Sequence, residues 1–352
     1  MTTTVTALSA SKAGAPFETI SLDRRDLRPD DVRIDIRYAG ICHSDIHQVR
    51  DEWGAALFPI TPGHEIIGTV AEVGADVRDH RVGDTVGVGC FVDSCLTCEA
   101  CRDGEEQFCV RGVVQTYSSR DYHGDVTYGG YSRQIVVRDH FVLKIPDGVD
   151  LAATTPLLCA GITTYAPLKR YGAGPGVKVG VIGMGGLGHV AVKIAAALGA
   201  EVSVLSRTDS KKADGLAFGA HAYHATEDAG VFDDLANHFD LLINTVGAGI
   251  PLGSFLGTLG RGGVMVNLGA PSEALSVPAF SLLTMRRAVA GSMVGGLAET
   301  QEMLDFCAEH GITATIEMIS ADQVDAYYDK VVSGDVRYRA VIDAETLRAP
   351  AA

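Results

Sequence analysis

Cysteine is the residue type with the clearest chemical signature in this chain, and most of the cysteines lie in one short segment. Five of the eight fall in GVGCFVDSCLTCEACRDGEEQFC, Gly87 to Cys109. Cys95, Cys98 and Cys101 follow C-x2-C-x2-C spacing, and Cys109 follows after seven residues. Four thiolates at such spacing suit a closed, tetrahedral zinc site.

The same segment has other interpretations: a disulfide knot, an iron–sulfur site or a redox centre. Clustered thiols in a reducing compartment indicate metal binding or catalysis more often than disulfides. The C-x3-C-P ending of ferredoxins is missing, so an iron–sulfur site is the second choice. The segment is also too poor in apolar residues to be held together by packing, which favours a structural metal ion. Cys90 lies outside the spacing and is expected to be a buried free thiol.

A second constellation is spread over the chain. Cys42 lies in GICHSDIHQ, His64 lies in TPGHEIIGTV, and Cys159 is distant from both. Two cysteines and one histidine suit a catalytic zinc ion, which needs three protein ligands and an exchangeable position. Glu65, next to His64, could fill the fourth position in a resting state. Such a zinc ion polarises a carbonyl or lowers the pKa of a bound alcohol, so hydride transfer becomes feasible near neutral pH.

Polar residues beside Cys42 could carry the proton of such a reaction. Ser44 follows Cys42 by two residues, and His47 follows three residues later. A hydroxyl that passes a proton to an imidazole is a known kind of relay. Asp45 is the candidate to orient His64 toward the metal without binding the metal itself.

A glycine motif indicates a dinucleotide site. Gly183, Gly185 and Gly188 form G-x-G-x-x-G in GMGGLG, directly after an apolar strand and at the start of a helix. This context is the one that the motif requires, because a pyrophosphate must approach the backbone at the N-terminus of the helix.

The residues after the second predicted strand indicate which dinucleotide binds. NAD sites usually place Asp or Glu there, whereas this chain has Ser206, Arg207 and Thr208, with Lys211 and Lys212 just after. Hydroxyls and cations suit a 2′-phosphate, so the sequence favours NADP.

The predicted secondary structure that positions these residues changes near Asp150. Before it, short alternating segments separated by Gly, Pro and Asp predict an irregular β-rich domain. After it, 151–170 is apolar at helical spacing, and the chain then alternates strands at 177–182 and 201–205 with a helix from about 186 to 198. Further apolar runs follow at 239–247 and 262–270, and 298–312 is expected to be a helix. This alternation predicts a parallel, doubly wound α/β sheet.

Composition limits the classes of partner and location. The 352 residues carry a net charge of -15, so nothing neutralises phosphates in bulk and no nucleic-acid partner is expected. The N-terminal residues lack the apolar region of a secretory signal. The most apolar stretch is interrupted by lysines and glycines, so no membrane span is expected. A cytoplasmic location is the default expectation.

Taken together, these motifs make the sequence resemble the zinc-dependent medium-chain alcohol dehydrogenases of the cinnamyl alcohol dehydrogenase group. The matching pieces cover nearly the whole chain: GICHSDIHQ, PGHEIIG, the four-cysteine lobe, PLLCAGITTY, GMGGLGHVAVKIA, EMLDFCAEHGI and DVRYRAVID. The resemblance implies a GroES-like β-rich catalytic domain at 1–152 with a structural zinc lobe at 90–110. It implies a Rossmann nucleotide domain at 153–290 and a return to the catalytic domain at 291–352.

The resemblance also implies two zinc ions per chain, NADP(H) as cofactor and a homodimer. The catalytic zinc ligands would be Cys42, His64, Glu65 and Cys159, and the structural ligands Cys95, Cys98, Cys101 and Cys109. Ser44 and His47 would form the relay. NADP(H) would contact Gly183, Gly185, Gly186, Leu187, Gly188, Ser206, Arg207, Thr208 and Lys211. The usual reaction of the group is reversible reduction of an aromatic, allylic or aliphatic aldehyde to a primary alcohol.

Two departures from the group concern the substrate. The plant lignin enzymes carry a pocket Trp shortly after the last lobe cysteine, and VRGVVQTY at 110–117 lacks it. The candidate pocket residues are instead Trp53, Val114, Gln115 and Met293. The acid that often ends the relay could be Asp51 or Glu52.

Two other functions are weighed against aldehyde reduction. One is NADPH-dependent reduction of a conjugated C=C bond on the same scaffold, which can dispense with the relay; Ser44 and His47 argue against it. The other is a non-catalytic nucleotide- or zinc-binding sensor, for which a complete set of ligands and relay residues would have no purpose.

Overall fold

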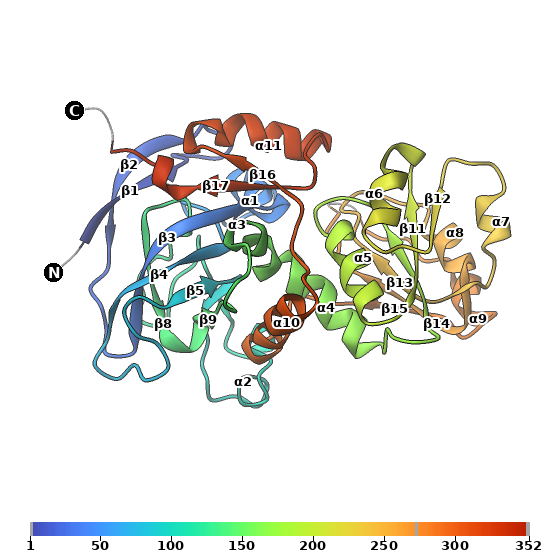
Figure 1. Cartoon of the computed structure of the whole chain (residues 1–352), viewed down its shortest axis with the longest axis horizontal. Helices are drawn as coiled ribbons and strands as arrows, with labels where there is room; N and C mark the ends of the chain where they lie inside the picture. The colour runs from blue at the N-terminus through green and yellow to red at the C-terminus, as the bar shows by residue number, and fades with distance from the viewer. Residues whose placement is uncertain (1–2, 272–273, 350–352) are drawn as a thin grey trace. The chain divides into compact units, whose positions relative to one another are not determined.

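The chain folds into two compact units. The structure is a computed structural model that describes residues 3–271 and 274–349. The first unit contains the residues up to Cys159 together with those from Gly295 onward, and the second unit contains Ala160–Val294 (Figure 1). Both ends of the chain therefore contribute to the first unit.

A seven-stranded sheet runs through the first unit. Its strands are β3 (Asp31–Ile41), β4 (Ile66–Val73), β5 (Thr85–Val88), β8 (Gln134–Arg138), β9 (Leu143–Lys144), β16 (Ile316–Ile319) and β17 (Arg339–Asp343). They lie in the order β16-β17-β3-β4-β5-β9, and β8 also pairs with β3. β17, from the C-terminal part of the chain, is antiparallel to β3. The β-rich first domain predicted from the sequence is confirmed.

Short elements surround this sheet. The strands are β1 (Thr3–Ser9), β2 (Glu18–Arg24), β6 (Phe91–Asp93) and β7 (Val114–Gln115). The helices are α1 (His43–Val49), α2 (Glu99–Arg102), α3 (Leu151–Thr154), α10 (Leu297–Glu309) and α11 (Val324–Ser333). The 3-10 turns are η1 (Glu106–Phe108), η2 (Asp139–Phe141), η3 (Thr155–Leu158), η5 (Ala321–Gln323) and η6 (Ala344–Thr346).

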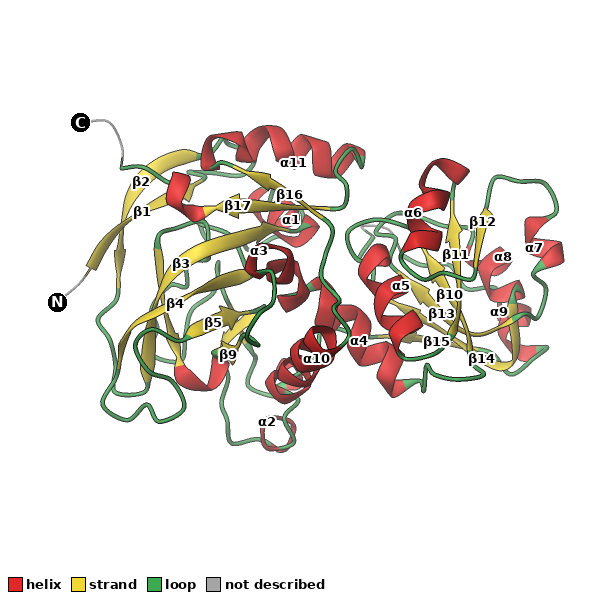
Figure 2. Ribbon diagram, in the orientation of Figure 1, coloured by secondary structure: helices red, strands yellow, loops and turns green. Residues whose placement is uncertain are grey.

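The second unit is a parallel, doubly wound sheet, as the sequence predicted. Its strands are β10 (Lys178–Ile182), β11 (Glu201–Ser206), β12 (Ala222–Ala225), β13 (Phe239–Asn244), β14 (Leu259–Asn267) and β15 (Ala288–Gly291). Its helices and turn are α4 (Ala160–Arg170), α5 (Gly188–Ala197), α6 (Lys212–Ala217), α7 (Val231–Asp234), α8 (Leu252–Gly257), α9 (Ala279–Leu283) and η4 (Asp209–Lys211). The order β12-β11-β10-β13-β14-β15 reverses between β10 and β13. Figure 2 shows α5 and α8 on opposite sides of this sheet.

The apolar stretch 151–170 is not one continuous helix. It forms α3, then η3 with Pro156 in its first turn, and then α4, and Cys159 lies at the break with a non-helical backbone (φ -126°, ψ -63°). The pair Leu151–Leu158 and Ala160–Arg170, bent by 58°, is together long and apolar enough to cross a membrane, whereas no single helix within 3–271 and 274–349 is. Nearly all of its residues are buried in the fold.

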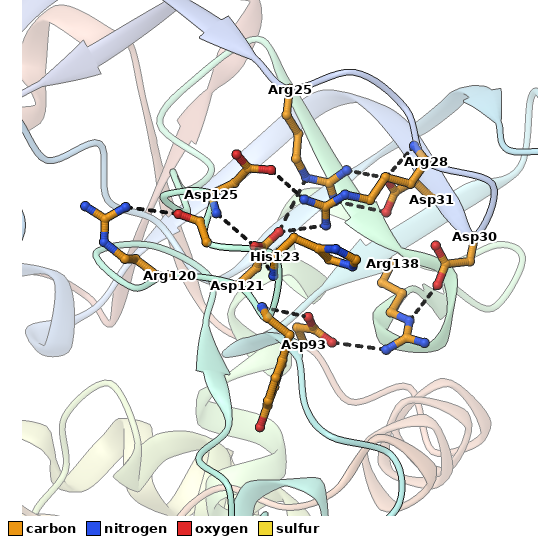
Figure 3. A network of polar contacts seen from close by, with 12 residues as sticks. Arg25, Arg28, Asp30, Asp31, Asp93, Arg120, Asp121, His123, Asp125 and Arg138 are labelled. Atoms are coloured by element: carbon orange, nitrogen blue, oxygen red, sulfur yellow. Dashed lines mark hydrogen bonds and ion pairs between the residues drawn. The ribbon is translucent and has the colours of Figure 1, made fainter.

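An ion-pair network joins arginines of the first unit to Asp93, at the end of β6, and to Asp121, in the loop after β7 (Figure 3). Arg28 donates to Asp121 at 2.7 Å between Nη1 and Oδ2, and its backbone N–H donates to Asp31 at 2.7 Å. Arg138 donates to Asp93 at 3.2 Å between Nη1 and Oδ1. These contacts hold the end of β6, which precedes the four cysteines, and the loop that follows β7 against arginines from other parts of the unit.

Replacing one acid of the network should weaken the fold in a pH-dependent way. Burial acts to raise the pKa of Asp121, but the Arg28 hydrogen bond and two backbone N–H groups hold it below its ordinary value. Its ionised form therefore stabilises the fold above the pKa of the unfolded chain, about 4, and the stabilisation is lost as pH falls through the lower folded pKa. We expect Asp121→Asn to cost about 1–3 kcal/mol at pH 7, measured by urea unfolding.

The matched control is Asp76→Asn, at an exposed position of the same unit. It should change the unfolding free energy by less than about 0.5 kcal/mol. The difference between the wild-type chain and Asp121→Asn should shrink toward zero below about pH 4. A difference that stays constant with pH would show that the carboxylate charge of Asp121 is not what stabilises the fold.

Candidate functional site

The first candidate site starts where β3 ends. Cys42 is the N-cap residue of α1, and its backbone N–H donates to Asp45 Oδ2 at 3.0 Å. The backbone N–H of Asp45 in turn faces the Cys42 side chain, so the two residues form a capping box. Reciprocal caps of this kind fix the start of a helix, here one of only seven residues.

β4 and the break after η3 bring the rest of the constellation to Cys42. The backbone N–H of Gly40 in β3 donates to Glu65 O at 2.9 Å, which places His64 and Glu65 beside the end of β3. Cys159 arrives from the break between η3 and α4. One ligand atom from each of Cys42, His64, Glu65 and Cys159 lies within 4.8 Å of the others, and all four residues are buried. The structure thus brings together the set predicted from the sequence.

Asp45 determines how His64 faces this cluster. His64 Nδ1 donates to Asp45 Oδ1 at 2.9 Å, and the backbone N–H of Gly63 donates to the same oxygen at 3.1 Å. Asp45 is fully buried. Because Nδ1 carries the hydrogen bond, Nε2 is the nitrogen left with a free lone pair for a metal. The predicted contact between Asp45 and His64 is confirmed.

Only one of the two carboxylate oxygens of Glu65 has a hydrogen-bond partner in the part of the chain that the structure describes. Oε1 pairs with Nη2 of Arg339, a residue only 3% exposed, while Oε2 has no hydrogen-bond partner among the described residues. A Cβ at Gly40 would lie 2.0 Å from Oε2, so only glycine leaves room for this carboxylate. An unpartnered buried oxygen beside two thiols and an imidazole is a donor set that fits zinc.

The surroundings favour different protonation states in the residues of the cluster: the thiolate for Cys42, but the protonated forms of His64 and Cys159, which would release a proton on binding a metal. The hydrogen bond from Cys159 is the main reason that the pKa of Cys42 lies well below its ordinary value, so Cys42 is the preferred thiolate. Burial acts to lower the pKa of His64, but the Asp45 carboxylate raises it well above the ordinary value. Burial raises the pKa of Glu65 to about 7, against the effect of the paired guanidinium. Negative charge on the ligands is therefore concentrated on Cys42.

The four-cysteine segment forms a second cluster. The ligand atoms of Cys95, Cys98, Cys101 and Cys109 all lie within 4.8 Å of one another, and none is in a disulfide. Cys98 Sγ lies 3.4 Å from Cys101 Sγ, and Cys95 Sγ lies 3.9 Å from it. A disulfide would need about 2.05 Å. A tetrahedron with zinc–sulfur bonds of about 2.3 Å has edges of about 3.8 Å, so the spacing fits zinc.

The glycine motif forms the turn between β10 and α5. Gly183 has φ +89°, and a Cβ at Gly188 would lie 2.0 Å from Gly183 O, so both positions require glycine. A Cβ at Gly185 would have nothing within 4 Å, which leaves this face of the turn open. Gly186 follows in the turn, and Leu187 is the N-cap of α5. The helix starts later than predicted because the turn uses all of these residues. A pyrophosphate fits at this helix N-terminus.

The end of β11 carries the residues predicted to select NADP. Ser206 is the last residue of β11, Arg207 and Thr208 follow it, and the Arg207 side chain is 84% exposed. Lys211 Nζ donates to Met184 O in the glycine turn at 2.9 Å. The Lys211 ammonium group therefore lies between the glycine turn and the end of β11, where the 2′-phosphate of a bound dinucleotide would be expected.

Comparisons with known proteins agree with these sites. Residues 28–147 match the alcohol dehydrogenase GroES-like domain, and residues 186–309 match the zinc-binding dehydrogenase family. The NADP-dependent alcohol dehydrogenase C 1 of Mycolicibacterium smegmatis is 55% identical over 98% of this chain and 99% of its own. The aldehyde reductase YahK of Escherichia coli is 49% identical over 97% and 99%.

A solved structure of a cinnamyl alcohol dehydrogenase from Sorghum bicolor superposes with a TM-score of 0.96 at 41% identity, over 99% of this chain and all of that one. The chain belongs to the zinc-dependent medium-chain alcohol dehydrogenases, in the cinnamyl alcohol dehydrogenase group. The fold predicted for it, a GroES-like β-rich part with a Rossmann sheet, is confirmed.

In this dehydrogenase the two candidate relay residues lie on α1. Ser44 Oγ lies 3.8 Å from Cys42 Sγ, so it is close to the first cluster. His47 Nδ1 donates to the Glu52 carboxylate, whereas Asp51 Oδ1 accepts the backbone N–H of Ala56 at 3.0 Å. The structure thus pairs His47 with Glu52, a choice that the sequence left open.

The four candidate pocket residues of the dehydrogenase lie in different surroundings. Trp53 is 48% exposed, and its ring centroid lies 4.9 Å from that of His47. Val114 and Gln115 form β7, where Val114 is buried and Gln115 is exposed. Met293 is an exposed residue of the second unit. Trp53 is the one that contacts a candidate relay residue.

Three residues of the dehydrogenase's sites were missed in the sequence. Arg339 pairs with Glu65, the Tyr117 ring centroid lies 6.0 Å from that of His64, and Glu106 Oε2 accepts the backbone N–H of Leu297 at 3.0 Å. Arg339 directly precedes the apolar residues 340–342 of β17, and that could have signalled a buried charge. Tyr117 and Glu106 follow no pattern, because their partners are distant in the sequence.

Loss of one lobe cysteine should remove one metal ion per chain. We expect the purified wild-type dehydrogenase to contain two zinc ions and Cys98→Ser to contain one, because a hydroxyl is a poor substitute for a thiolate ligand. Atomic absorption on dialysed protein measures this. The Cys98→Ser chain should also unfold at lower urea concentration, since zinc binding contributes to folding.

Cys307→Ala is the matched control, since Cys307 is buried in α10 and belongs to neither cluster. It should keep two zinc ions per chain. Two zinc ions in Cys98→Ser would contradict the assignment of the lobe as a metal site.

Proposed function

We propose that this chain is a zinc- and NADP(H)-dependent alcohol dehydrogenase that reduces aromatic, allylic or aliphatic aldehydes. The observation that carries the proposal is the buried cluster of Cys42, His64, Glu65 and Cys159 in a chain that also has a dinucleotide-binding sheet edge. The proposal is supported by relatives named as NADP-dependent alcohol dehydrogenase and aldehyde reductase. The reaction is hydride transfer between NADPH and the carbonyl carbon.

The buried cluster would hold the catalytic zinc, and the four-cysteine cluster the structural zinc. Zinc at the first site supplies Lewis-acid polarisation of a carbonyl or alcohol oxygen. Asp45 would keep Nε2 of His64 directed at the metal, and Arg339 would hold the Glu65 carboxylate in place. These two contacts orient ligands before any substrate binds.

The proton required by aldehyde reduction would come through α1. Ser44 lies beside Cys42, and His47 follows it on the same helix three positions later, which is one turn. The Glu52 carboxylate would hold His47 in the tautomer with a proton on Nδ1, leaving Nε2 to exchange a proton. Trp53, whose ring packs against that of His47 at an interplanar angle of 31°, would limit the motion of the imidazole and could offer a flat surface to an aromatic substrate.

The other assignments of the sequence are proposed on the same basis. The first unit would be the catalytic domain, and the second the nucleotide domain that contacts NADP(H) through its glycine turn and the residues after β11. A homodimer is proposed, supported by exposed apolar side chains of α9, Phe280 (77% exposed) and Leu283 (69% exposed), and by the edge strand β15. We also propose a cytoplasmic location, which would keep the lobe thiols reduced.

Turnover with NADPH is the direct test. Pure, zinc-replete protein should oxidise NADPH in the presence of aromatic, allylic and aliphatic aldehydes and release the corresponding alcohols. His64→Ala should lower kcat/KM at least about a thousandfold, because zinc contributes several kcal/mol and each 1.36 kcal/mol is tenfold. NADPH binding to this variant, followed by fluorescence, should be unchanged.

His310→Ala, at the exposed end of α10, is the matched control and should keep full activity. Full activity in His64→Ala would contradict the proposal of a catalytic zinc ion. A saturated aldehyde as the product from an unsaturated one would identify the enzyme as a C=C reductase. Binding of NADPH without turnover of any aldehyde would favour the sensor.

Cofactor choice can be tested at Arg207. Arg207→Asp should shift the ratio of kcat/KM for NADPH over NADH toward NADH by roughly 10–100-fold, since a charged hydrogen bond to phosphate is worth about 1.5–3 kcal/mol. The exposed residue Arg261 of the same unit provides the control, Arg261→Asp, which should leave the ratio unchanged. An unchanged ratio in Arg207→Asp would show that Arg207 does not bind the 2′-phosphate.

A further inference from the structure

Two asparagines form an amide bridge at the carboxyl edge of the second sheet. Asn244 is the last residue of β13, Asn267 is the last residue of β14, and the two are register partners. Asn244 Nδ2 donates to Asn267 Oδ1 at 2.7 Å. Asn244 is only 1% exposed, so its amide must find its partners inside the protein.

The bridge extends at both ends to the loops that follow the strands. The backbone N–H of Val246 donates to Asn244 Oδ1 at 3.1 Å, and Asn267 Nδ2 donates to Gly269 O at 2.6 Å. Three hydrogen bonds therefore run in one direction from Val246 through both amides to Gly269. Chains of this kind polarise one another, so each bond strengthens its neighbours.

The two loops and the glycine turn are packed against each other. A Cβ at Gly269 would lie 2.0 Å from Val246 O, so the loops after β13 and β14 touch through their backbones. A Cβ at Gly183 would lie 2.7 Å from Val246 Cγ2. Thr245 Oγ1 donates to Ile182 O at 2.8 Å. The bridge thus fixes loops that directly adjoin the dinucleotide turn.

The strand order says which part of the dinucleotide these loops face. In a doubly wound sheet of this order, a dinucleotide binds across the point where the order reverses, here between β10 and β13. The 2′-phosphate end belongs to the β11 side, which carries Ser206 and Arg207. The loops after β13 and β14 therefore lie on the side of the nicotinamide half.

We infer that Asn244 and Asn267 are positioning residues for the nicotinamide half of NADP(H). The amide bridge holds the loops after β13 and β14 in the arrangement that receives this half, and it has no role at the adenosine half. The inference rests on the proposed use of NADP(H). Its physical basis is that one hydrogen bond joins the two amides, while the remaining amide oxygen and NH2 group bind Val246 and Gly269, which an apolar pair could not do.

Comparing the affinity of the protein for NADPH with its affinity for a truncated ligand distinguishes this positioning role from a general structural role. Isothermal titration calorimetry of the zinc-replete full chain measures the Kd of NADPH and of adenosine 2′,5′-bisphosphate, which lacks the nicotinamide nucleotide. Asn267→Ala should weaken NADPH binding about tenfold, which corresponds to about 1.4 kcal/mol and to the loss of one or two hydrogen bonds. The Kd of adenosine 2′,5′-bisphosphate should stay within about twofold.

Asn244→Ala should act in the same way, and the double variant should be little worse than either single one, because the residues act as one unit. Asn267 is only half-buried, so Asn267→Ala keeps the test available if Asn244→Ala does not fold. Asn237→Ala is the matched control: Asn237 lies before the amino end of β13 and accepts a hydrogen bond from Arg287 Nη2 at 2.8 Å. It should change neither Kd.

The outcomes are distinct. Equal weakening of both ligands would show that the bridge supports the sheet in general and would overturn the inference. An unchanged Kd for NADPH in Asn267→Ala would overturn it as well. Failure of the wild-type chain to bind NADPH would instead remove the proposed function on which the inference rests.

Discussion

The arrangement of the first unit depends on the cost of burying four metal-ligand side chains within 4.8 Å of one another. Two thiols, an imidazole and a carboxylate cannot be buried together without a compensating cation, because desolvated negative charges and unpartnered oxygens are expensive. The surrounding residues follow from this constraint. Gly40 gives the Glu65 carboxylate space, Arg339 pairs with it, and Asp45 orients His64. A zinc ion held by these residues would offset this cost and supply the chemistry of the proposed reaction.

The four-cysteine lobe would also depend on a metal ion, but for its folding and not for catalysis. Its apolar side chains Phe108 and Val110 are exposed, and its sulfur atoms stand at the spacing of a zinc tetrahedron. Its attachment to the rest of the unit is polar: Arg138 donates to Asp93, just before the four cysteines, and Glu106 accepts the backbone N–H of Leu297 at the start of α10. A metal ion and these polar contacts would together replace the packing that a larger domain uses.

In the second unit, different strands carry different features at one edge of the sheet. The glycine turn after β10 leaves an open face at a helix N-terminus, the residues after β11 are cationic, and the loops after β13 and β14 are joined by two amides. Parallel strands bring all of these to one edge because their carboxyl ends point the same way. On the proposed use of NADP(H), the two halves of the dinucleotide would contact different strands of this edge.

The sequence by itself determined the ligand types, the glycine turn and the order of β and α segments, because spacing and periodicity are local and survive without tertiary contacts. C-x2-C-x2-C and G-x-G-x-x-G are examples. It could not decide between Asp51 and Glu52, nor find Arg339, Glu106 or the bridge of Asn244 and Asn267. Only the structure decided these. Asp51 and Glu52 are both near His47 along the chain, so spacing could not choose between them, and the partners of the other residues lie on different strands, helices or loops. Hydrogen bonds between such residues depend on how strands pair, and pairing leaves no mark on the spacing along the chain.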